Sequence, residues 1–393
     1  MSTDLEQAYR EFPATERWTY MDVAARGLLP RSAREQLDAH LDERMWAEVD
    51  KHGYFDLIER VRGRFARHIN ATADEIAFTK NVTEGIAAIA AAIDWRSGDN
   101  VVICPEIEHP ANVYAWLNLQ RRGVEIRMVA PRAGALPADE IVARIDGRTR
   151  AVACATVTFA PGFRTDLATI GAACRAQGVM LVVDAAQSVG VLDNDVERLR
   201  IDALAASTQK GLLGLYGMGF LYCRREWAER LQPAYLSRFG VDLGDASEAD
   251  MSFEYRLAAG ARRFDLGNYN FSAAVNADCS LAYLDGFGKP AIESYVLGLS
   301  HALARGFLEM GLPVNGGEPG AHLAHIVTVG TMSGGHDTTG DARMQSLHDH
   351  LMEHRVRLSI RRGVLRFSLH LYNTMHDVEQ VLELARDWRR RNP

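Results

Sequence analysis

Two residues that could take part in catalysis, an acid and a lysine, each stand at the end of a short apolar run or just after one. Asp184 ends the run VMLVVD, and Lys210 follows DALAASTQ, 26 residues further along the chain. In a parallel sheet, ligands bind beyond the carboxyl ends of the strands, so an acid and an amine at two such ends would face one site. Taken alone, Asp184 also fits a helix N-cap, and an isolated lysine is usually a solvated surface residue.

A third segment, TKNVTEG at 79–85, predicts a strand that turns into a helix. A helix N-terminus presents free backbone N–H groups and the positive end of the helix dipole, and both suit a phosphate group. Thr83 would lie in the first turn of this helix. Considered alone, the segment is equally well explained as a plain capped helix.

Together, the three segments meet the needs of pyridoxal phosphate. This cofactor requires a lysine for its aldehyde, an acid for its ring nitrogen and a cradle for its phosphate. Lys210 would carry it as a Schiff base, and Asp184 would keep the ring nitrogen protonated, because a carboxylate in a desolvated pocket raises the pKa of a neighbouring cation. We therefore expect an enzyme that acts at the Cα of an amino acid.

These residues depend for their positions on apolar β-branched runs that alternate with amphipathic stretches, a pattern typical of a parallel sheet with crossover helices. Strands are predicted at 75–80, 100–104, 124–129, 151–157, 179–184, 202–207 and 219–224, and helices at 84–93, 111–120 and 167–177. A long helix at 290–310 precedes strands at 324–330, 355–360 and 364–370 and helices at 341–353 and 374–389. We expect an α/β fold: a large domain with a mostly parallel central sheet at 31–285, and a smaller α+β domain formed by 1–30 and 286–393.

The composition argues against several other classes of protein. The 393 residues carry a formal net charge of −7, whereas a general nucleic-acid binder needs a basic face. No apolar run has the length that a bilayer requires, and the N-terminus lacks the pattern of a signal peptide. Five scattered cysteines show no CxxC and no metal-ligand spacing. We expect a cytoplasmic protein with reduced thiols, no metal site, and neither nucleic acid nor membrane as a partner.

The order and spacing of several segments resemble the class V aminotransferase family of fold-type I pyridoxal-phosphate enzymes, which includes cysteine desulfurases and isopenicillin-N-epimerase-like proteins. These segments are YMDVAARGLLPRSARE at 20–35, NVTEG at 81–85, EIEHPAN at 106–112, DAAQSVG at 184–190, STQKGLLG at 207–214, RRFDLGN at 262–268 and VLRFSLHLYNT at 364–374. Any one of them would be weak evidence; the set in this order is specific. The resemblance covers nearly the whole chain and implies a homodimer with the cofactor near the subunit interface.

The resemblance also implies a role for each matching residue. Lys210 would hold the cofactor and move the Cα proton, Asp184 would pair with the ring nitrogen, and His109 would stack on the ring. Gln187 would lie at the phenolate side. The other cofactor contacts would come from Val82, Thr83, Thr158, Ser207, Gln209 and Asn268. Asn268 stands where desulfurases supply a contact from the partner subunit, and Thr158 stands where relatives carry Asn or Gln.

Arg366 is the expected anchor for the substrate α-carboxylate. A guanidinium binds a carboxylate through two parallel hydrogen bonds, which would fix the Cα–H bond relative to the ring. The segment is rich in arginine, so a structural ion pair is the alternative interpretation, and only the place within RFSLHLYNT favours Arg366. Arg26 and Tyr216 are further candidates for residues that face the substrate.

The choice of reaction stays open at this point. Cysteine desulfurases use a cysteine on a loop just ahead of the last arginine segment, and this chain has no cysteine after Cys279. We favour a C–S lyase that works by β-elimination, with an aminotransferase using a 2-oxo acid, or an amino-acid epimerase, as alternatives. A nucleotide-binding or pyridoxal-phosphate-binding protein without catalysis is the non-enzymatic alternative, although the chain lacks both GxGxxG after its first strand and GxxxxGK[ST].

Overall fold

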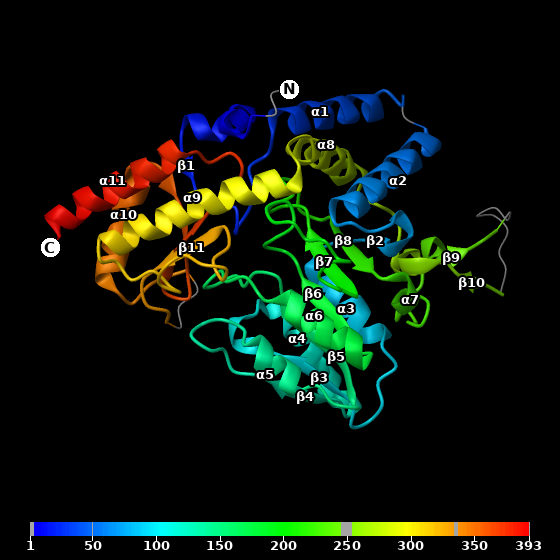
Figure 1. The fold of residues 1–393 in the computed structure, drawn as a ribbon. Coiled ribbons are helices and arrows are strands. Elements are labelled where there is room, and N and C mark those ends of the chain that lie inside the picture. The colour runs from blue at the N-terminus through cyan, green and yellow to red at the C-terminus, as the bar shows by residue number, and fades with distance from the viewer. Residues whose placement is uncertain (1–3, 49, 245–253, 334–336, 393) are drawn as a thin grey trace.

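The computed structural model describes residues 4–48, 50–244, 254–333 and 337–392. Its centre is a seven-stranded sheet in the order β2-β8-β7-β6-β5-β3-β4 (Figure 1). The strands are β2 (Ile76–Thr79), β3 (Asn100–Ile103), β4 (Glu125–Met128), β5 (Thr149–Ala155), β6 (Met180–Asp184), β7 (Ala203–Ser207) and β8 (Gly219–Cys223). All seven predicted strands are confirmed. The sheet is mostly parallel, and only β8 runs antiparallel to its neighbours β2 and β7.

Helices bury both faces of this sheet, which explains why its inner strands are apolar throughout instead of alternating. On β6, Val182 packs with Ile86 of helix α3 (Val82–Ala92), whereas Leu181 and Val183 belong to the core on the opposite face. That second core also takes in α2 (Lys51–His68) and α6 (Leu167–Gln177). Each inner strand is therefore held in register from two sides, and this register fixes where its carboxyl end lies.

The helix predicted at 111–120 is the main departure from the expected elements. The chain there forms α4 (Tyr114–Leu117) flanked by two short 3-10 helices. Pro110 lacks the N–H that a regular helix would use, and the buried side chain of Asn112 bonds to two other side chains. The predicted helices 84–93, 167–177 and 290–310 are confirmed as α3, α6 and α9 (Lys289–Glu309).

The C-terminal part is built on a three-stranded antiparallel sheet in the order β11-β14-β13. Its elements are β11 (Ile326–Val329), α10 (Ala342–Glu353), β12 (Val356–Arg357), β13 (Ser359–Arg361), β14 (Val364–Ser368) and α11 (Met375–Arg391). The predicted strand 355–360 is split between β12 and β13, and β12 pairs instead with β1 (Thr19–Tyr20). In Figure 1, α9 runs from α8 (Phe271–Phe287) to this part of the molecule. These pairings support the division that we propose, with 1–30 and 286–393 as one domain and 31–285 as the other.

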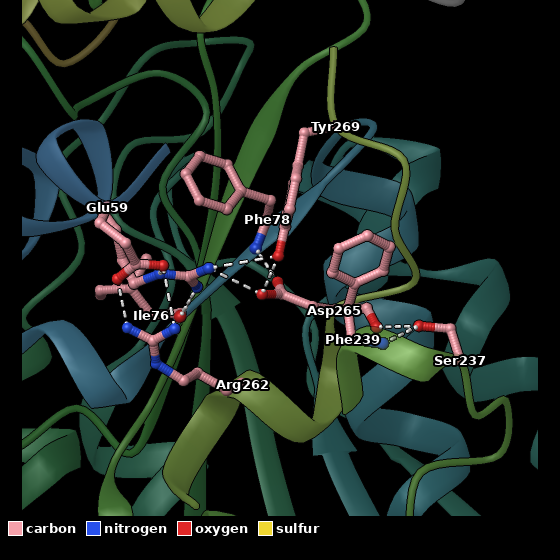
Figure 2. Close-up of polar contacts among 9 residues, drawn as sticks. Glu59, Ile76, Phe78, Ser237, Phe239, Arg262, Asp265 and Tyr269 are labelled. Carbon is pink, nitrogen blue, oxygen red and sulfur yellow. Dashed lines mark hydrogen bonds and ion pairs between the residues drawn. The ribbon is translucent and has the colours of Figure 1, made fainter. Parts of the chain in front are cut away.

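A buried ion pair joins the edge of the large sheet to the segment that precedes α8. Arg62 of α2 contacts Asp265 at 2.8 Å, and the two side chains are 0% and 1% exposed. Asp265 also accepts hydrogen bonds from the backbone N–H of Phe78 at 2.7 Å and from the Tyr269 hydroxyl at 2.9 Å (Figure 2). Because a buried charge without a partner is costly, this network fixes the segment that carries Asn268 against strand β2.

The helix α8 packs with both α2 and α1 (Arg31–Met45). Within the described ranges, no helix combines the length and the apolar character that crossing a membrane would require. The same residues hold no group of three or more His, Cys, Asp or Glu side chains arranged to bind a metal ion.

Candidate active site

A cavity of about 380 Å³ opens at the carboxyl ends of β5, β6 and β7, beside the N-terminus of α3. It brings together nearly all the residues singled out from the sequence. Those that line it are Val82, Thr83, His109, Asp184, Gln187, Ser207, Gln209, Lys210 and Arg366, and the candidates Arg26 and Tyr216 line it too. This is the edge of an open α/β sheet at which ligands are expected.

Asp184 and Lys210 lie on successive strand ends, as their spacing predicts. Asp184 is buried and accepts a hydrogen bond from the backbone N–H of Ala186 at 2.9 Å. Burial raises the pKa of Asp184, which favours an arrangement with a cation opposite the carboxylate. Desolvation lowers the pKa of Lys210 to about 8, against the opposing effect of the Asp184 charge. A lysine with this pKa is partly neutral near pH 8, the form in which an amine attacks an aldehyde.

The loop of Lys210 is held by close approach of the N-terminal segment. The N–H of Gly27 donates to the carbonyl oxygen of Gln209 at 2.8 Å. A Cβ atom at position 27 would lie 2.2 Å from the carbonyl oxygen of Lys210, so only glycine fits there. Next to this contact, Gln187 donates its Nε2 to the carbonyl oxygen of Ala24 at 3.2 Å.

The first turn of α3 contributes a set of free N–H groups to the cavity. Asn81 is the N-cap, and its side chain accepts from the N–H of Glu84 at 3.0 Å. Val82 is buried and Thr83 is exposed at the cavity wall. The turn therefore offers backbone donors, a hydroxyl and the positive end of a dipole to an anion.

His109 lines the cavity from the segment that follows β3. Its Nδ1 accepts from the backbone N–H of Ala111 at 3.2 Å, which assigns the proton of a neutral ring to Nε2. The ring meets Phe159 edge to face, with a centroid separation of 5.5 Å. This contact fixes the orientation of an otherwise exposed imidazole.

Arg366 is buried on β14, where two of its donors form hydrogen bonds and its charge faces one acid. Its Nε donates to the hydroxyl of Ser359 at 3.1 Å, one terminal nitrogen donates to the carbonyl oxygen of Phe159 at 3.0 Å, and the other lies 3.7 Å from Asp22. Since a guanidinium has five N–H donors, three remain outside these hydrogen bonds and can serve a ligand. Burial lowers the pKa of Arg366 to about 10, so the side chain stays charged at neutral pH.

Two predicted contacts lie outside the cavity wall. Thr158 is buried, and its hydroxyl accepts from the N–H groups of Gly162 and Phe163 at 3.1 and 3.0 Å. It thus shapes the loop that carries Phe159. Asn268 is exposed on the segment before α8, and its predicted role in a partner subunit stays a prediction.

Sequence reasoning missed two buried groups beside the site. Glu108 lies next to His109; it accepts from the N–H of Ala155 at 2.7 Å and from the Asn112 amide at 3.0 Å. Burial, with a contribution from the Asp184 charge, raises its pKa to about 8. His370 is buried and lies behind the Lys210 loop. The position of Glu108 directly before His109 could have identified it from the sequence. No feature of the sequence pointed to His370.

The residues present fit pyridoxal phosphate. Among the described residues, the Lys210 amine makes no hydrogen bond or ion pair, and the Oε1 of Gln187 is buried without a partner. Lys210 would hold the cofactor aldehyde as an imine, and the second N–H of the Gln187 amide would be available to the phenolate oxygen of the ring. Asp184 suits the ring nitrogen, and the α3 turn suits the phosphate. Together the fold and the cavity define a fold-type I pyridoxal-phosphate enzyme.

Comparison with known proteins gives the same result. The family model "Aminotransferase class-V" matches residues 20–381. A relative described as a probable cysteine desulfurase from Methanothermobacter thermautotrophicus is 31% identical over 306 residues, which is 76% of this chain and 74% of the relative. The chain belongs to the class V aminotransferase family and is a pyridoxal-phosphate-dependent enzyme.

Solved structures share its fold. The apo cysteine desulfurase from Thermococcus onnurineus NA1 superimposes with a TM-score of 0.83 at 24% identity and covers 97% of each chain. The cystine C–S lyase C-DES, in complex with its reaction product cysteine persulfide, gives a TM-score of 0.83 at 23% identity. That match covers 95% of this chain and 99% of the other.

Proposed function

We propose that this enzyme is a C–S lyase that cleaves the bond between Cβ and a sulfur leaving group of an amino acid. The observation that supports this most directly is the connection between β13 and β14. Arg361 pairs with Val364, so Arg362 and Gly363 alone form the turn, both with positive φ angles of 52° and 82°. A two-residue hairpin turn is tight. It stands where desulfurases carry the loop with their persulfide-forming cysteine.

The cysteines of the chain also argue against persulfide transfer. All five lie in the described part of the structure, and none of them lines the cavity. Desolvation raises the pKa of every one of these thiols, which disfavours the nucleophilic thiolate. A thiol that is buried elsewhere does not reach the substrate sulfur.

The side chains of the cavity have the chemistry that elimination requires. Arg366 would hold the α-carboxylate, and the Lys210 amine would take the Cα proton. The bound cofactor supplies the electron sink for the Cα–H bond pair. The Cβ–S bond then breaks with its electrons on sulfur, and the thiol leaves. With one water consumed, the remaining carbon skeleton becomes pyruvate and ammonia.

Among relatives, the named activity of C-DES on cystine supports a lyase on this fold. The name of the Methanothermobacter relative supports sulfur amino acids as the substrate class. The first choice of substrate is therefore a cysteine derivative.

The deciding experiment incubates the purified holoenzyme with cysteine derivatives and measures pyruvate, ammonia and thiol. Equal amounts of the three, with none from Lys210→Ala, are the expected result. Conversion of a 2-oxo acid to its amino acid, without thiol release, would replace the lyase by an aminotransferase. Exchange of the Cα proton with inversion, and no product, would favour an epimerase.

We also propose a cytoplasmic homodimer. The cysteines form no disulfide, which suits a reducing compartment. Tyr114, Tyr235 and Leu266 are large apolar side chains that are 68%, 76% and 41% exposed. Their exposure suits an interface that a second subunit would cover. Sedimentation of the purified protein tests the stoichiometry, and a monomer would remove the dimer from the proposal.

A further inference from the structure

The hairpin β13–β14 presents two arginines on one face. Ser359 pairs with Arg366, and Arg361 pairs with Val364. Because side chains alternate along a strand, Arg361 points to the same face as Ser359 and therefore as Arg366. Diagonal neighbours across an antiparallel pair lie roughly 7–8 Å apart, so the two guanidiniums are close without occupying one position. Both line the cavity.

Arg361 is tethered at one end only. One of its terminal nitrogens contacts Asp337 at 2.5 Å and the carbonyl oxygen of Ile360 at 2.7 Å. Asp337 is 68% exposed, whereas the Arg361 side chain is 21% exposed. The remaining N–H donors of Arg361 are available to a ligand in the cavity. The positive charge of Arg361 also lowers the pKa of the Lys210 amine.

Arg26 supplies a third guanidinium from a different segment. It lines the same cavity next to Gly27, whose backbone contacts the Lys210 loop. Among the described residues, Arg26 forms no ion pair with an acid, and its side chain is exposed at the cavity mouth. Tyr216, 61% exposed, also lines the cavity.

Three arginines of the described part of the chain line the cavity, whereas a simple amino acid brings one α-carboxylate in addition to the cofactor phosphate. Asp184 is the single acid among the described residues that line it. In the proposed function the α3 turn takes the phosphate and Arg366 takes the α-carboxylate. Arg361 contacts the exposed Asp337 and Arg26 forms no ion pair among the described residues, so each has N–H donors that neither the phosphate nor the α-carboxylate uses. Cations gathered at a partly desolvated site favour an anionic ligand.

We propose that the substrate is an amino acid whose side chain carries a second anionic group, a carboxylate or a sulfur oxyanion, bound by Arg361 with Arg26. This inference rests on the proposed function, since it places the anion on the leaving group of the same substrate. It narrows the substrate class to cysteine derivatives with an acidic S-substituent. Neutral or basic derivatives would bind more weakly.

The test uses two ligands of the same size that differ by one charge, S-carboxymethylcysteine and S-carbamoylmethylcysteine. Borohydride treatment of the holoenzyme fixes the cofactor on Lys210 and stops turnover, and calorimetry then measures binding without any reaction. We expect the acid to bind about tenfold more tightly than the amide, the size of one well-placed charge interaction. Arg361→Gln should reduce this preference to less than about twofold, and Arg361→Lys should retain part of it.

Arg362→Gln is the matched control. Arg362 is the next residue in the chain; it bonds to the carbonyl oxygen of Glu106 and does not line the cavity. Its substitution should leave the tenfold preference intact. Equal binding of the acid and the amide by the unsubstituted protein would overturn the inference, as would equal losses in both arginine variants.

A parallel assay of pyruvate release separates this inference from the proposed function. Tight binding of the acid, with no pyruvate from either ligand, would support the acidic substrate class and contradict the proposed lyase activity. Equal pyruvate release from both ligands, together with equal binding, would support the lyase activity and contradict the acidic substrate class. Arg26→Gln is measured for cofactor retention as well: a loss of cofactor with an unchanged preference would assign Arg26 to the phosphate and not to the substrate.

Discussion

His370 donates its Nε2–H to the carbonyl oxygen of Gly211 at 2.8 Å, directly after Lys210 in the chain. The tautomer follows from the second nitrogen, because Nδ1 accepts from the backbone N–H of Leu371 at 2.7 Å. Burial lowers the pKa of His370 to about 4, so the ring stays neutral and keeps one donor. A residue of the C-terminal part thus fixes the peptide that follows the cofactor lysine.

Replacing His370 by leucine should leave the Gly211 carbonyl buried without a donor. We expect the free energy of unfolding to fall by about 1–3 kcal/mol and the covalent attachment of pyridoxal phosphate to slow. His370→Gln, whose amide nitrogen reaches a similar position, should recover most of both losses. Urea denaturation and the growth of the cofactor's visible absorbance measure the two effects. If glutamine is as harmful as leucine, ring packing and not the hydrogen bond is what matters.

The pH dependence of cofactor attachment should report the pKa of Lys210. The amine must be neutral to react, and its pKa is lowered to about 8. In cofactor-free protein, the attachment rate should rise with pH to a midpoint near 8 and then level off. Because the Asp184 charge raises this pKa, Asp184→Asn should move the midpoint to lower pH. A rate that still climbs at pH 10 would indicate an ordinary, solvated lysine.

Glu108 should make the protein less stable as the pH rises. Its folded pKa is about 8, against an ordinary value of 4.5, so between these values the folded state binds one more proton than the unfolded chain. The free energy of unfolding therefore falls by up to about 1.4 kcal/mol for each unit that the pH rises within this window. Glu108→Gln should remove that slope.

Urea denaturation of both proteins at pH 5.5, 6.5 and 7.5 gives the comparison. If the substitution also alters hydrogen bonds, it shifts the free energy of unfolding by the same amount at each pH. Such a shift leaves the difference in pH slope between the two proteins unchanged. Parallel curves for the two proteins would show that Glu108 is ionised in the fold throughout this range.

Loss of the buried ion pair between Arg62 of α2 and Asp265 should strongly destabilise the protein. Asp265→Asn leaves the Arg62 charge without its main partner, and we expect a loss of about 3–5 kcal/mol in the free energy of unfolding. The partly exposed pair of Glu59 and Arg262 is the control, and Arg262→Gln should cost less than about 1 kcal/mol. Chemical denaturation measures both, and similar small losses would contradict a structural role for Asp265.

The sequence determined the framework of the site. Uninterrupted apolar runs predict strands buried on both faces, and such strands are found in parallel sheets whose carboxyl ends form one edge. The positions of Asp184 and Lys210 directly after two such runs were therefore enough to place them together. Val82 and Thr83 followed from the change of period that marks the strand-to-helix turn.

The tertiary structure alone decided how the C-terminal part completes the cavity. His370 and Gly211 are 159 residues apart, and no local pattern encodes a contact across that separation. The same holds for the face on which Arg361 lies, because the register with β14 and the turn at Arg362 and Gly363 set it. The Thr158 hydroxyl accepts from two N–H groups of its own loop, a role that the sequence did not indicate, and its contact with the cofactor stays a prediction. The local sequence pattern determines the helices and strands. The role of a side chain where these elements contact one another depends on packing between segments that are distant in the chain.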